Sequence, residues 1–202
     1  MKKLERDFYK RSAIEVAKEL LGKYLVHEYK GNKLIGRIVE VEAYMGVEDK
    51  AAHSYGGRRT ERTEVMYKEG GYTYVFQIYG MYYCVNVVTS EMDIPQAVLI
   101  RALEPIEGLE EMSRNRYRKS YEELTAYQKK NLTNGPGKLC MAMNIDKSLN
   151  GENLCNGRLY VLDNKEKFNI VSSKRINIDY AEEAKDYLWR FYIEGNTYVS
   201  KK

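Results

Sequence analysis

The sequence has few of the residues and segments that mark membrane, secreted or zinc-binding proteins. It contains no run of 18 apolar residues, which excludes a transmembrane helix of ordinary length. Its first residues, MKKLERD, lack the apolar segment of a signal peptide. Its three cysteines, Cys84, Cys140 and Cys155, are widely spaced and odd in number, and it has only two histidines. We therefore expect free thiols in a reducing cytoplasm, no disulfide framework and no metal site.

Proline is scarce as well, which argues against a hinge between domains. The sequence has three prolines in 202 residues and shows no repeat, low-complexity stretch or linker. A chain of this size can bury ~70% of its unfolded surface, so it needs no crosslink to fold. We predict a single domain spanning residues 1–202.

The excess of positive charge is small, whereas tyrosine is abundant. The 33 Lys and Arg residues against 29 Asp and Glu residues give a net charge of +4, which allows a nucleic-acid partner without requiring one. Tyrosine supplies 19 of the aromatic residues, against four Phe and one Trp. Because its ring is apolar and its hydroxyl polar, this composition favours wet, half-buried surfaces over a dry core.

Capping signals and hydrophobic periodicity predict helices and strands that do not alternate regularly. Ser12 and Glu15 form a capping box for a helix that ends at Gly22. Further helices are expected from Pro105 onward, over 120–131 and over 138–143. Strands are expected over 23–29, 34–44 and 96–102, around 159–162, 168–178 and 189–193, and as a pair within 72–88 that meets near 79–81. This order favours an α+β domain with a mostly antiparallel or mixed sheet.

One predicted strand carries two carboxylates on a single face. In the segment 37–44, side chains alternate, so Glu40, Glu42 and Tyr44 share one face, about 7 Å apart between successive members. Val39, Val41 and Ala43 point to the other face and resemble a core. Two carboxylates at this distance suit acid and base work on a glycosidic bond, but a solvated outer face fits the same pattern.

Two later segments have compositions that suit ligand or phosphate contacts. His53 follows the strand among small residues, where it could line a site or serve only as a structural histidine. The segment 56–63 places two glycines beside three arginines and hydroxyl side chains, which suits a phosphate-contacting loop or a solvated turn.

The turn at 79–81 has an unusual composition for a hairpin tip. Such tips normally carry Asn, Asp or Gly, whereas here Tyr79 precedes Gly80 and Met81 follows it. Large side chains at a tip can act as wedges between base pairs. A tip that folds back on the protein or contacts a second copy fits the sequence equally well.

Five blocks between about Gly36 and Gly195, in this order, resemble the alkyladenine (3-methyladenine) DNA glycosylases. The blocks are RIVEVEAYMGVEDKAAHSYGGRRTERTEVMY, YTYVFQIYGMYYCVNVV, VLIRALEPIEGLEEM, NGPGKLC and RFYIEG. The resemblance implies a single compact α+β domain with a curved, mostly antiparallel sheet, flanking helices and a protruding β-hairpin. It also implies a cytoplasmic monomer, nucleoid-associated in a bacterium, that acts on damaged duplex DNA without a cofactor.

The implied reaction is base-excision repair by a monofunctional glycosylase. Members of the family flip damaged purines out of the duplex, in the class of 3-methyladenine, 7-methylguanine, hypoxanthine and ethenoadenine. They hydrolyse the N-glycosidic bond with an activated water and do not cut the backbone.

The resemblance also assigns roles to single residues. Glu42 matches the general base, Arg101 helps to hold the attacking water, and the carbonyl of Ile193 is the third holder. The matching base pocket consists of Tyr44, Ala52, His53, Phe76 and Asn86, with Asn86 disfavouring the exocyclic amine of guanine. The matching DNA contacts are Tyr79 as the wedge, Met81, Arg58, Thr60, Arg62, Gly137 and Lys138.

Three features depart from the family pattern. Phe76 stands where better-known members have a stacking Tyr, so the ring is kept and the hydroxyl is lost. The chain from Asn86 to Arg101 is two residues longer, near the expected DNA surface, and the segment 149–186 matches weakly.

Two alternatives from other classes remain open on the residues alone. One is a non-catalytic module that binds structured RNA, which the basic and Tyr-rich composition also fits. The other is a carbohydrate glycosidase that uses Glu40 and Glu42. The resemblance gives Glu40 no role in acid or base catalysis, which favours a structural or electrostatic one.

Overall fold

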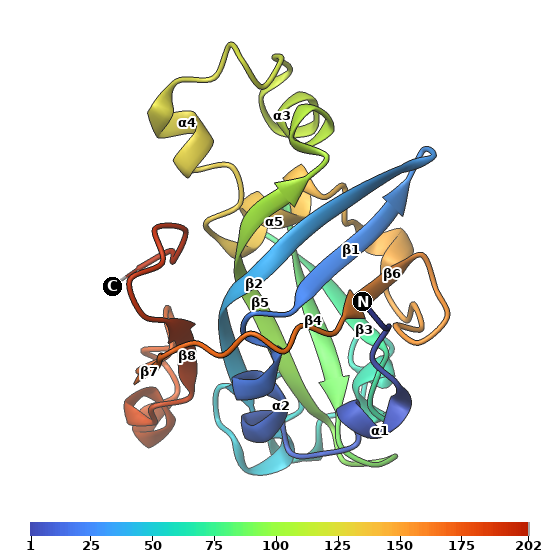
Figure 1. The fold of residues 1–202 in the computed structure, drawn as a ribbon. Coiled ribbons are helices and arrows are strands. Elements are labelled where there is room, and N and C mark those ends of the chain that lie inside the picture. Colours follow the sequence, from blue (N-terminus) through green and yellow to red (C-terminus); the bar gives the residue numbers. More distant parts are fainter. Residues whose placement is uncertain (202) are drawn as a thin grey trace.

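A curved antiparallel sheet forms the centre of the computed structural model, which describes residues 1–201 (Figure 1). Its main path runs in the order β3-β4-β5-β2-β1-β6, β8 pairs with β2, and β7 pairs with β8. The strands are β1 (Tyr24–Tyr29), β2 (Asn32–Tyr44), β3 (Thr73–Ile78), β4 (Tyr82–Thr89), β5 (Gln96–Glu107), β6 (Leu159–Leu162), β7 (Ile170–Ser173) and β8 (Arg190–Ile193). All the pairings between these strands are antiparallel. The predicted α+β class with a curved antiparallel sheet is confirmed.

Short helices flank this sheet. They are α1 (Arg6–Tyr9), α2 (Ala13–Leu20), α3 (Leu109–Tyr117), α4 (Ala126–Lys130) and α5 (Pro136–Ala142), with five 3-10 helices η1 (Gly46–Glu48), η2 (Tyr55–Gly57), η3 (Glu64–Tyr67), η4 (Lys147–Leu149) and η5 (Glu182–Asp186). Helix α2 packs on β2, and α5 packs on β4 and β5. None of the helices in residues 1–201 has the length and hydropathy needed to cross a membrane.

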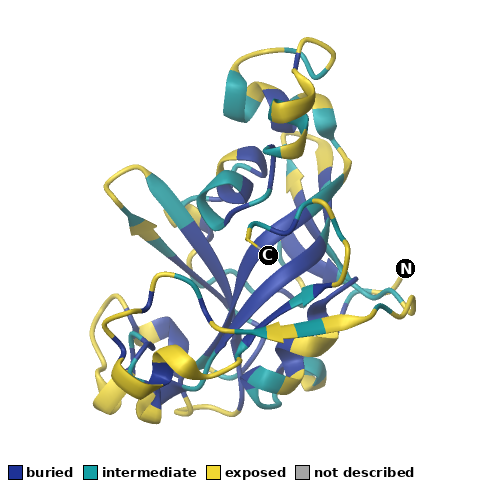
Figure 2. Cartoon of the chain, turned by 90° about the vertical axis from the view of Figure 1, so that its left-hand side faces the viewer, coloured by how far each residue is buried: buried dark blue, intermediate teal, exposed yellow. Residues whose placement is uncertain are grey.

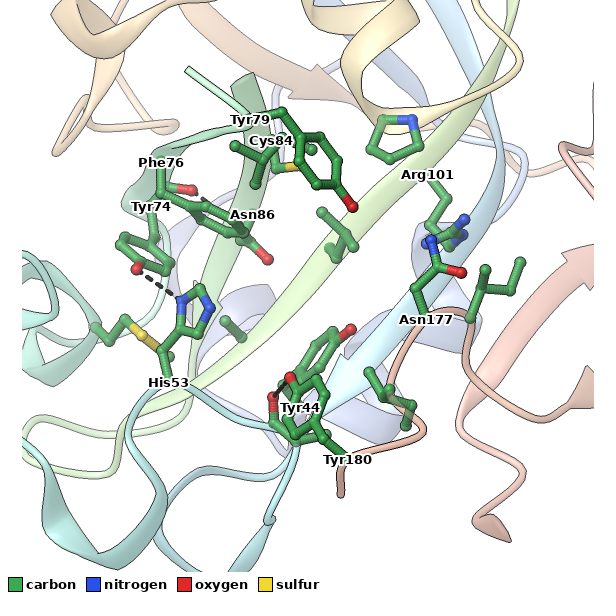
Figure 3. Close-up of a pocket in the computed structure, with 18 residues that line it drawn as sticks. Tyr44, His53, Tyr74, Phe76, Tyr79, Cys84, Asn86, Arg101, Asn177 and Tyr180 are labelled. Carbon is green, nitrogen blue, oxygen red and sulfur yellow. Dashed lines mark hydrogen bonds between the residues drawn. The ribbon is translucent and has the colours of Figure 1, made fainter. Parts of the chain in front are cut away.

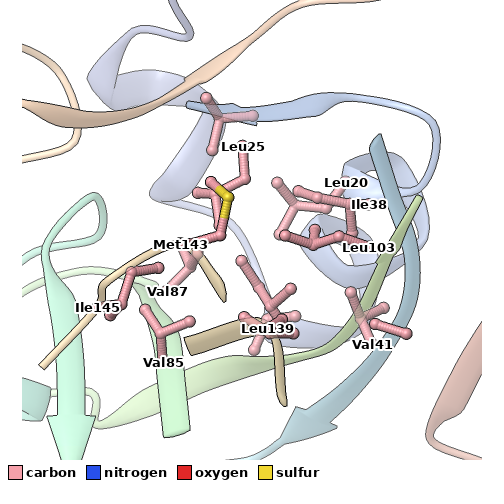
Figure 4. Packing of buried hydrophobic residues seen from close by; sticks show 14 of the residues in the cluster. Leu20, Leu25, Ile38, Val41, Val85, Val87, Leu103, Leu139, Met143 and Ile145 are labelled. Atoms are coloured by element: carbon pink, nitrogen blue, oxygen red, sulfur yellow. The ribbon is translucent and has the colours of Figure 1, made fainter. Parts of the chain in front are cut away.

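The hydrophobic core lies between the sheet and helices α2 and α5. Leu20 from α2, Leu139 from α5, and Ile38 and Leu103 from the sheet are fully buried and belong to one cluster (Figure 4). Each buried side chain of this size contributes roughly 1.5–3 kcal/mol from the loss of water-exposed apolar surface. The core fixes strands β2 and β5 against each other, and these two strands carry the acidic and basic residues described below.

The predicted capping box and C-terminal glycine of the first long helix, α2, are confirmed. The Ser12 hydroxyl accepts a hydrogen bond from the Glu15 backbone amide and donates one to the Glu15 carboxylate, which caps α2. Gly22 follows the helix at a φ of +86°, a conformation that favours glycine. The chain then enters the β1–β2 hairpin, which the sequence also predicts.

The helix expected from Pro105 is wrong, because strand β5 continues through it to Glu107. Pro105 pairs with Gly36 of β2, beside an irregularity in the register, where its missing amide hydrogen is tolerated. Helix α3 starts only after Gly108, which has a φ of +80°. Pairing with β2 therefore outweighs the local helical pattern.

The helix expected from Ser120 is also wrong, since residues 120–123 form a turn. The Glu123 carboxylate accepts from the Ser120 amide, which makes half of the expected capping box. The next amide, that of Tyr121, donates to Glu110 and ties the turn to α3. Helix α4 begins after Thr125, which forms a complete capping box with Gln128.

Near the C-terminus, the strand expected over 168–178 is shorter than predicted. Only Ile170–Ser173 forms strand β7, and the chain leaves the sheet after it. The helix expected over 138–143 begins two residues earlier, with Pro136 in its first turn.

The β3–β4 hairpin projects from the body of the molecule. Figure 2 shows it as a separate arm whose tip is exposed while its base is buried in the sheet. The two strands pair from Thr73 with Val87 to Ile78 with Tyr82. The protruding hairpin that the resemblance implies is therefore present.

Candidate active site

A cavity of about 380 Å³ opens beside the projecting hairpin. Its wall is formed by side chains from β2 to β5, from the loop after β2 and from the segment that follows β7 (Figure 3). The predicted site residues that line it are Tyr44, His53, Phe76, Tyr79, Asn86 and Arg101. The fold thus brings together residues that are up to 57 positions apart in the sequence.

The carboxylate of Glu42 lies directly beneath the wall of this cavity and is fully buried. Its Oε2 accepts a hydrogen bond from the Tyr44 hydroxyl at 2.8 Å. Its Oε1 accepts one from the Ile176 backbone amide at 2.8 Å and lies 3.3 Å from Nη1 of Arg101. Since all three partners line the cavity, the Glu42 carboxylate is fixed in place at its edge by two hydrogen bonds and an ion pair.

Glu40 is equally buried, so the hypothesis of a solvated outer face is wrong. Its Oε1 accepts from Nε of Arg101 at 3.2 Å and from Nη1 of Arg190 at 3.0 Å. Its Oε2 accepts from the backbone amide of Ser200 at 2.7 Å. Both oxygens of Glu40 are therefore engaged by the protein, away from the cavity.

Arg101 lies between the two carboxylates and is itself buried. Burial disfavours the charged guanidinium, but the charges of Glu42 and Glu40 outweigh this effect and raise the pKa of Arg101 above its ordinary value. The same surroundings raise the pKa of Tyr44 well above its usual range, through burial and the neighbouring Glu42. Tyr44 therefore remains a hydroxyl that donates to the carboxylate.

Aromatic rings form the opposite wall of the cavity. The rings of His53 and Phe76 meet edge to face, with centroids 4.7 Å apart, and Nδ1 of His53 lies 2.9 Å from the Tyr74 hydroxyl. Burial, together with the nearby charges of Arg62 and Arg58, lowers the pKa of His53 to about 4. His53 is thus a neutral ring at physiological pH.

Asn86 is fixed at the back of the cavity. It is buried, and its Nδ2 donates to the backbone carbonyl of Tyr74 at 3.0 Å. The amide oxygen of Asn86 therefore points into the open space (Figure 3). Ala52, which the sequence also assigns to the pocket, is buried but does not line the cavity, whereas its neighbour Ala51 does.

The hairpin tip has the backbone of a two-residue turn with both central residues at positive φ. Tyr79 has a φ of +50° and Gly80 one of +69°, and the Met81 amide donates to the Ile78 carbonyl. Tyr79 is 82% exposed and Met81 65% exposed. A tip that folds back on the protein is therefore wrong. A bulky residue at positive φ is uncommon and stores backbone strain.

Basic and hydroxyl side chains lie beside the aromatic wall. Arg58, Thr60 and Arg62 are exposed, and together with His53 and Thr63 they line a second cavity of about 90 Å³. The guanidinium of Arg62 lies 5.1 Å from the Phe76 ring centroid. A phosphate bound by these side chains would therefore lie directly beside the cavity of about 380 Å³.

On the other side, the start of α5 approaches the hairpin closely. A Cβ on Gly137 would come within 3.1 Å of Tyr82, so glycine allows the contact between helix and strand. Lys138 donates to the side-chain oxygens of Asn131 and Asn134. The predicted residues Gly137 and Lys138 thus flank the cavity rather than line it.

The structure does not bring Ile193 to the cavity. Ile193 lies in the core on strand β8, and its carbonyl accepts from the amide of Asn196. The backbone that reaches Glu42 is instead that of Ile176. Ile176 lies in the segment 149–186, where the family blocks match weakly.

Residues of this segment that the sequence analysis missed also line the cavity: Ile176, Asn177, Ile178 and Tyr180. They are held by Arg175, which is fully buried and bidentate to Asp49, at 2.5 and 2.8 Å. The Arg175 guanidinium also lies 4.8 Å from the centroid of the Tyr44 ring. No local pattern in the sequence predicts the ion pair between Asp49 and Arg175, which are 126 positions apart.

The longer segment between Asn86 and Arg101 forms the loop at the far end of β4 from the hairpin tip. Asp93 in this loop pairs with Arg59 at 2.8 Å, and its amide donates to the Tyr67 carbonyl. Asp93 therefore supports the loop that carries Arg58 and Arg62, and it does not line the cavity.

Among residues 1–201, no three His, Cys, Asp or Glu side chains gather as a possible metal site. The three cysteines are free, and burial raises the pKa of Cys84, which lines the cavity, to about 11. What the cavity offers is a buried carboxylate beside a guanidinium, facing a wall of aromatic rings and the exposed tip of a hairpin. This arrangement suits a hydrolase that acts on a planar group extruded from a polymer.

Comparison with known proteins assigns this arrangement to a family. The model of the methylpurine-DNA glycosylase family matches residues 7–197. A Clostridium novyi protein provisionally named 3-methyladenine DNA glycosylase is 67% identical over 202 residues, which cover the whole of both chains. Proteins of the same name from Desulfitobacterium hafniense and Clostridium tetani are 63% and 59% identical, over at least 99% of each chain.

The chain belongs to the methylpurine-DNA glycosylase family. It is a DNA glycosylase of base-excision repair, a hydrolase of N-glycosyl bonds, as the motifs predict. The two alternatives, an RNA-binding module without activity and a carbohydrate glycosidase, are therefore wrong.

Proposed function

We propose that this chain excises alkylated and deaminated purines from duplex DNA with a water that Glu42 activates. The substrate class is that of 3-methyladenine, 7-methylguanine, hypoxanthine and ethenoadenine. The observation that carries the proposal is the buried Glu42 carboxylate, contacted by three residues that line a cavity with aromatic walls.

The flipped base would lie between Tyr44 on one side and His53 with Phe76 on the other. A cavity of about 380 Å³ is large enough for a purine. Phe76 retains a stacking face although it lacks a hydroxyl. Neutral His53 offers a hydrogen bond to the base edge without placing a positive charge against a cationic lesion.

Glu42 would orient and deprotonate the water that attacks C1′ of the deoxyribose. Arg101 and the backbone at Ile176 border the same carboxylate, and we assign them the holding of this water; Ile176 takes the role expected of Ile193. The negative charge of Glu42 also stabilises the oxocarbenium character that the sugar gains as the bond breaks. General base catalysis of this kind is typically worth 10²–10⁴-fold.

Among the described residues that line the cavity, none is an evident general acid for the departing base. With a pKa of about 4, His53 is deprotonated at neutral pH, and the hydroxyl of Tyr44 is already engaged in a hydrogen bond that it donates to Glu42. Cationic bases such as 3-methyladenine and 7-methylguanine leave without a further proton, whereas hypoxanthine has to acquire one. We therefore infer faster excision of cationic lesions than of hypoxanthine.

Duplex DNA would be held by the exposed side chains around the cavity. Tyr79 would fill the space that the flipped nucleotide leaves, with Met81 beside it, since both project from the hairpin. Arg58, Thr60 and Arg62 on one side and Lys138 on the other would contact phosphates.

We propose that the enzyme works as a monomer on the nucleoid of the bacterial cytoplasm.

The test is base release from three duplexes that contain 7-methylguanine, hypoxanthine or only normal bases. We expect abasic sites in the first two, formed faster with 7-methylguanine, and strand breaks only after alkali treatment. Breaks without alkali would contradict the monofunctional reaction. Equal or faster release of hypoxanthine would contradict the absence of a general acid.

A further inference from the structure

Four charged side chains form an alternating buried chain beneath the cavity. The order is Glu42, Arg101, Glu40 and Arg190, with contacts of 3.3, 3.2 and 3.0 Å between successive members. Glu40 and Glu42 are fully buried, Arg101 is 8% exposed and Arg190 is 3% exposed. Their formal charges sum to zero.

The pairing of three neighbouring strands brings these four charged side chains together. Glu40 and Glu42 lie on one face of β2, Arg101 comes from the neighbouring β5, and Arg190 from β8 on the other side. Arg190 also donates to the carbonyl of Lys201 and to the Ser173 hydroxyl. Arg190 is therefore anchored independently of Arg101.

We propose that Glu40 and Arg190 are positioning residues for base excision, which hold Arg101 against Glu42 and balance the charge around it. The inference rests on the proposed role of Glu42 as the general base. It assigns a function to two residues that touch neither the cavity nor the DNA-binding side chains.

Glu40 restricts the orientation of Arg101. The Nε edge of the guanidinium is bound to Glu40, which directs Nη1 toward Glu42. Without this anchor, the Arg101 side chain, which lines the cavity, would be free to turn into it. Removing one partner of a buried ion pair also leaves the other charge uncompensated, which is strongly unfavourable.

The balance of charge sets how strongly Glu42 holds its negative charge. The charged groups around Glu42 are Glu40 from its own strand, Arg101 from β5, Arg190 from β8 and Arg175 from the segment after β7. Tyr44, Cys84 and Tyr180 also lie near it, and burial raises the pKa of each, so they remain neutral. Arg175 is neutralised by Asp49. The net charge near Glu42 therefore depends on Glu40 and Arg190, which act with opposite signs.

Neutral substitutions of these two residues should shift the acidic limb of the pH–rate profile in opposite directions. In E40Q the positive charges predominate, the Glu42 carboxylate is favoured, and the limb moves to lower pH. In R190Q the negative charge of Glu40 is left uncompensated, and the limb moves to higher pH. For charges about 7 Å apart at an effective dielectric constant of ~20, each shift is about one to two pH units.

The experiment is single-turnover excision of 7-methylguanine from a duplex between pH 5 and 9, by wild type, E40Q, R190Q and R190K. The lesion is fully cationic at the acidic end of this range, so the acidic limb of the profile does not include protonation of the leaving base. R190K keeps the positive charge and is the matched control. We expect its acidic limb at the wild-type pH, even if its excision rate is lower. Thermal unfolding and affinity for an abasic-site duplex verify that each variant is folded.

Opposite shifts in E40Q and R190Q, with no shift in R190K, would establish the positioning role. Unmoved limbs in both neutral variants, or shifts in the same direction, would overturn it, and so would a shifted limb in R190K. A parallel E42Q measurement separates this inference from the proposed function. If E42Q retains wild-type turnover, Glu42 is not the base and the proposed function itself fails.

Discussion

Replacing Tyr79 by Asn should change the stability of the fold and the affinity for DNA in opposite directions. Tyr79 occupies the first central position of a turn whose second position is Gly80, both at positive φ. Asn-Gly is the preferred sequence for such a turn, whereas a bulky residue at positive φ is strained. Because the ring is 82% exposed, its loss removes little packing from the free protein.

The magnitudes follow from the ring's exposure. An aromatic side chain of 150–250 Å² that is 82% exposed offers ~120–200 Å² to the DNA, or roughly 3–5 kcal/mol at ~25 cal/mol per Å² as an upper bound. Aromatic stacking on a base measured by substitution is worth about 1–3 kcal/mol. We therefore expect Y79N to bind an abasic-site duplex about 5- to 150-fold more weakly. We expect its free energy of unfolding to rise by up to ~1 kcal/mol.

The assay pairs fluorescence anisotropy on an abasic-site duplex with chemical denaturation of the free protein. Y79F keeps the ring and the turn conformation, so it should bind within about twofold of wild type. Wild-type affinity of Y79N for the abasic duplex would refute the wedge. A marked loss of stability in Y79N would refute the view that the exposed ring adds strain without packing.

Three further predictions concern the walls of the cavity. N177G keeps the left-handed backbone at a φ of +61° and loses only the amide that faces the cavity, so it should bind the damaged duplex about fivefold more weakly with unchanged thermal stability; unchanged affinity would exclude a contact. His53 has a pKa of about 4 in the folded protein against 6.5 ordinarily, so the free energy of unfolding should fall as the pH falls from about 6.5 to 4, by up to ~3 kcal/mol. H53Q should lack this component in denaturation curves at pH 7 and 4.5, and an unchanged difference between the two pH values would contradict the assignment. The double variant R58S/R62S should reduce the slope of log K against log salt by about 1.8, whereas an unchanged slope would show that neither arginine contacts phosphate.

Features set by neighbouring residues were predictable from the sequence. The capping box at Ser12 and Glu15, the β1–β2 hairpin and the turn at 79–81 depend on local signals, and the structure contains all three. Six of the site residues also converge on one cavity. They do so because the matching blocks lie on strands whose pairing the fold determines.

Features set by contacts between distant segments were not predictable. Pro105 has the local pattern of a helix start, yet β5 continues through it because it pairs with β2. The burial of Glu40 depends on Arg190, 150 positions away. The wall formed by residues 176–180 depends on the pair of Asp49 and Arg175. The charges of such buried pairs look like surface charges in a single sequence, so neither periodicity nor composition reveals them.

The most direct test of the central claim is single-turnover excision of 7-methylguanine by E42Q, beside its affinity for the damaged duplex. Gln keeps the size of the side chain and an oxygen that accepts from Tyr44 or Ile176, but it cannot take a proton from water. We predict a rate reduced by about 10²–10⁴-fold and an affinity within a few-fold of wild type. Excision by E42Q at the wild-type rate would contradict the claim that Glu42 activates the water.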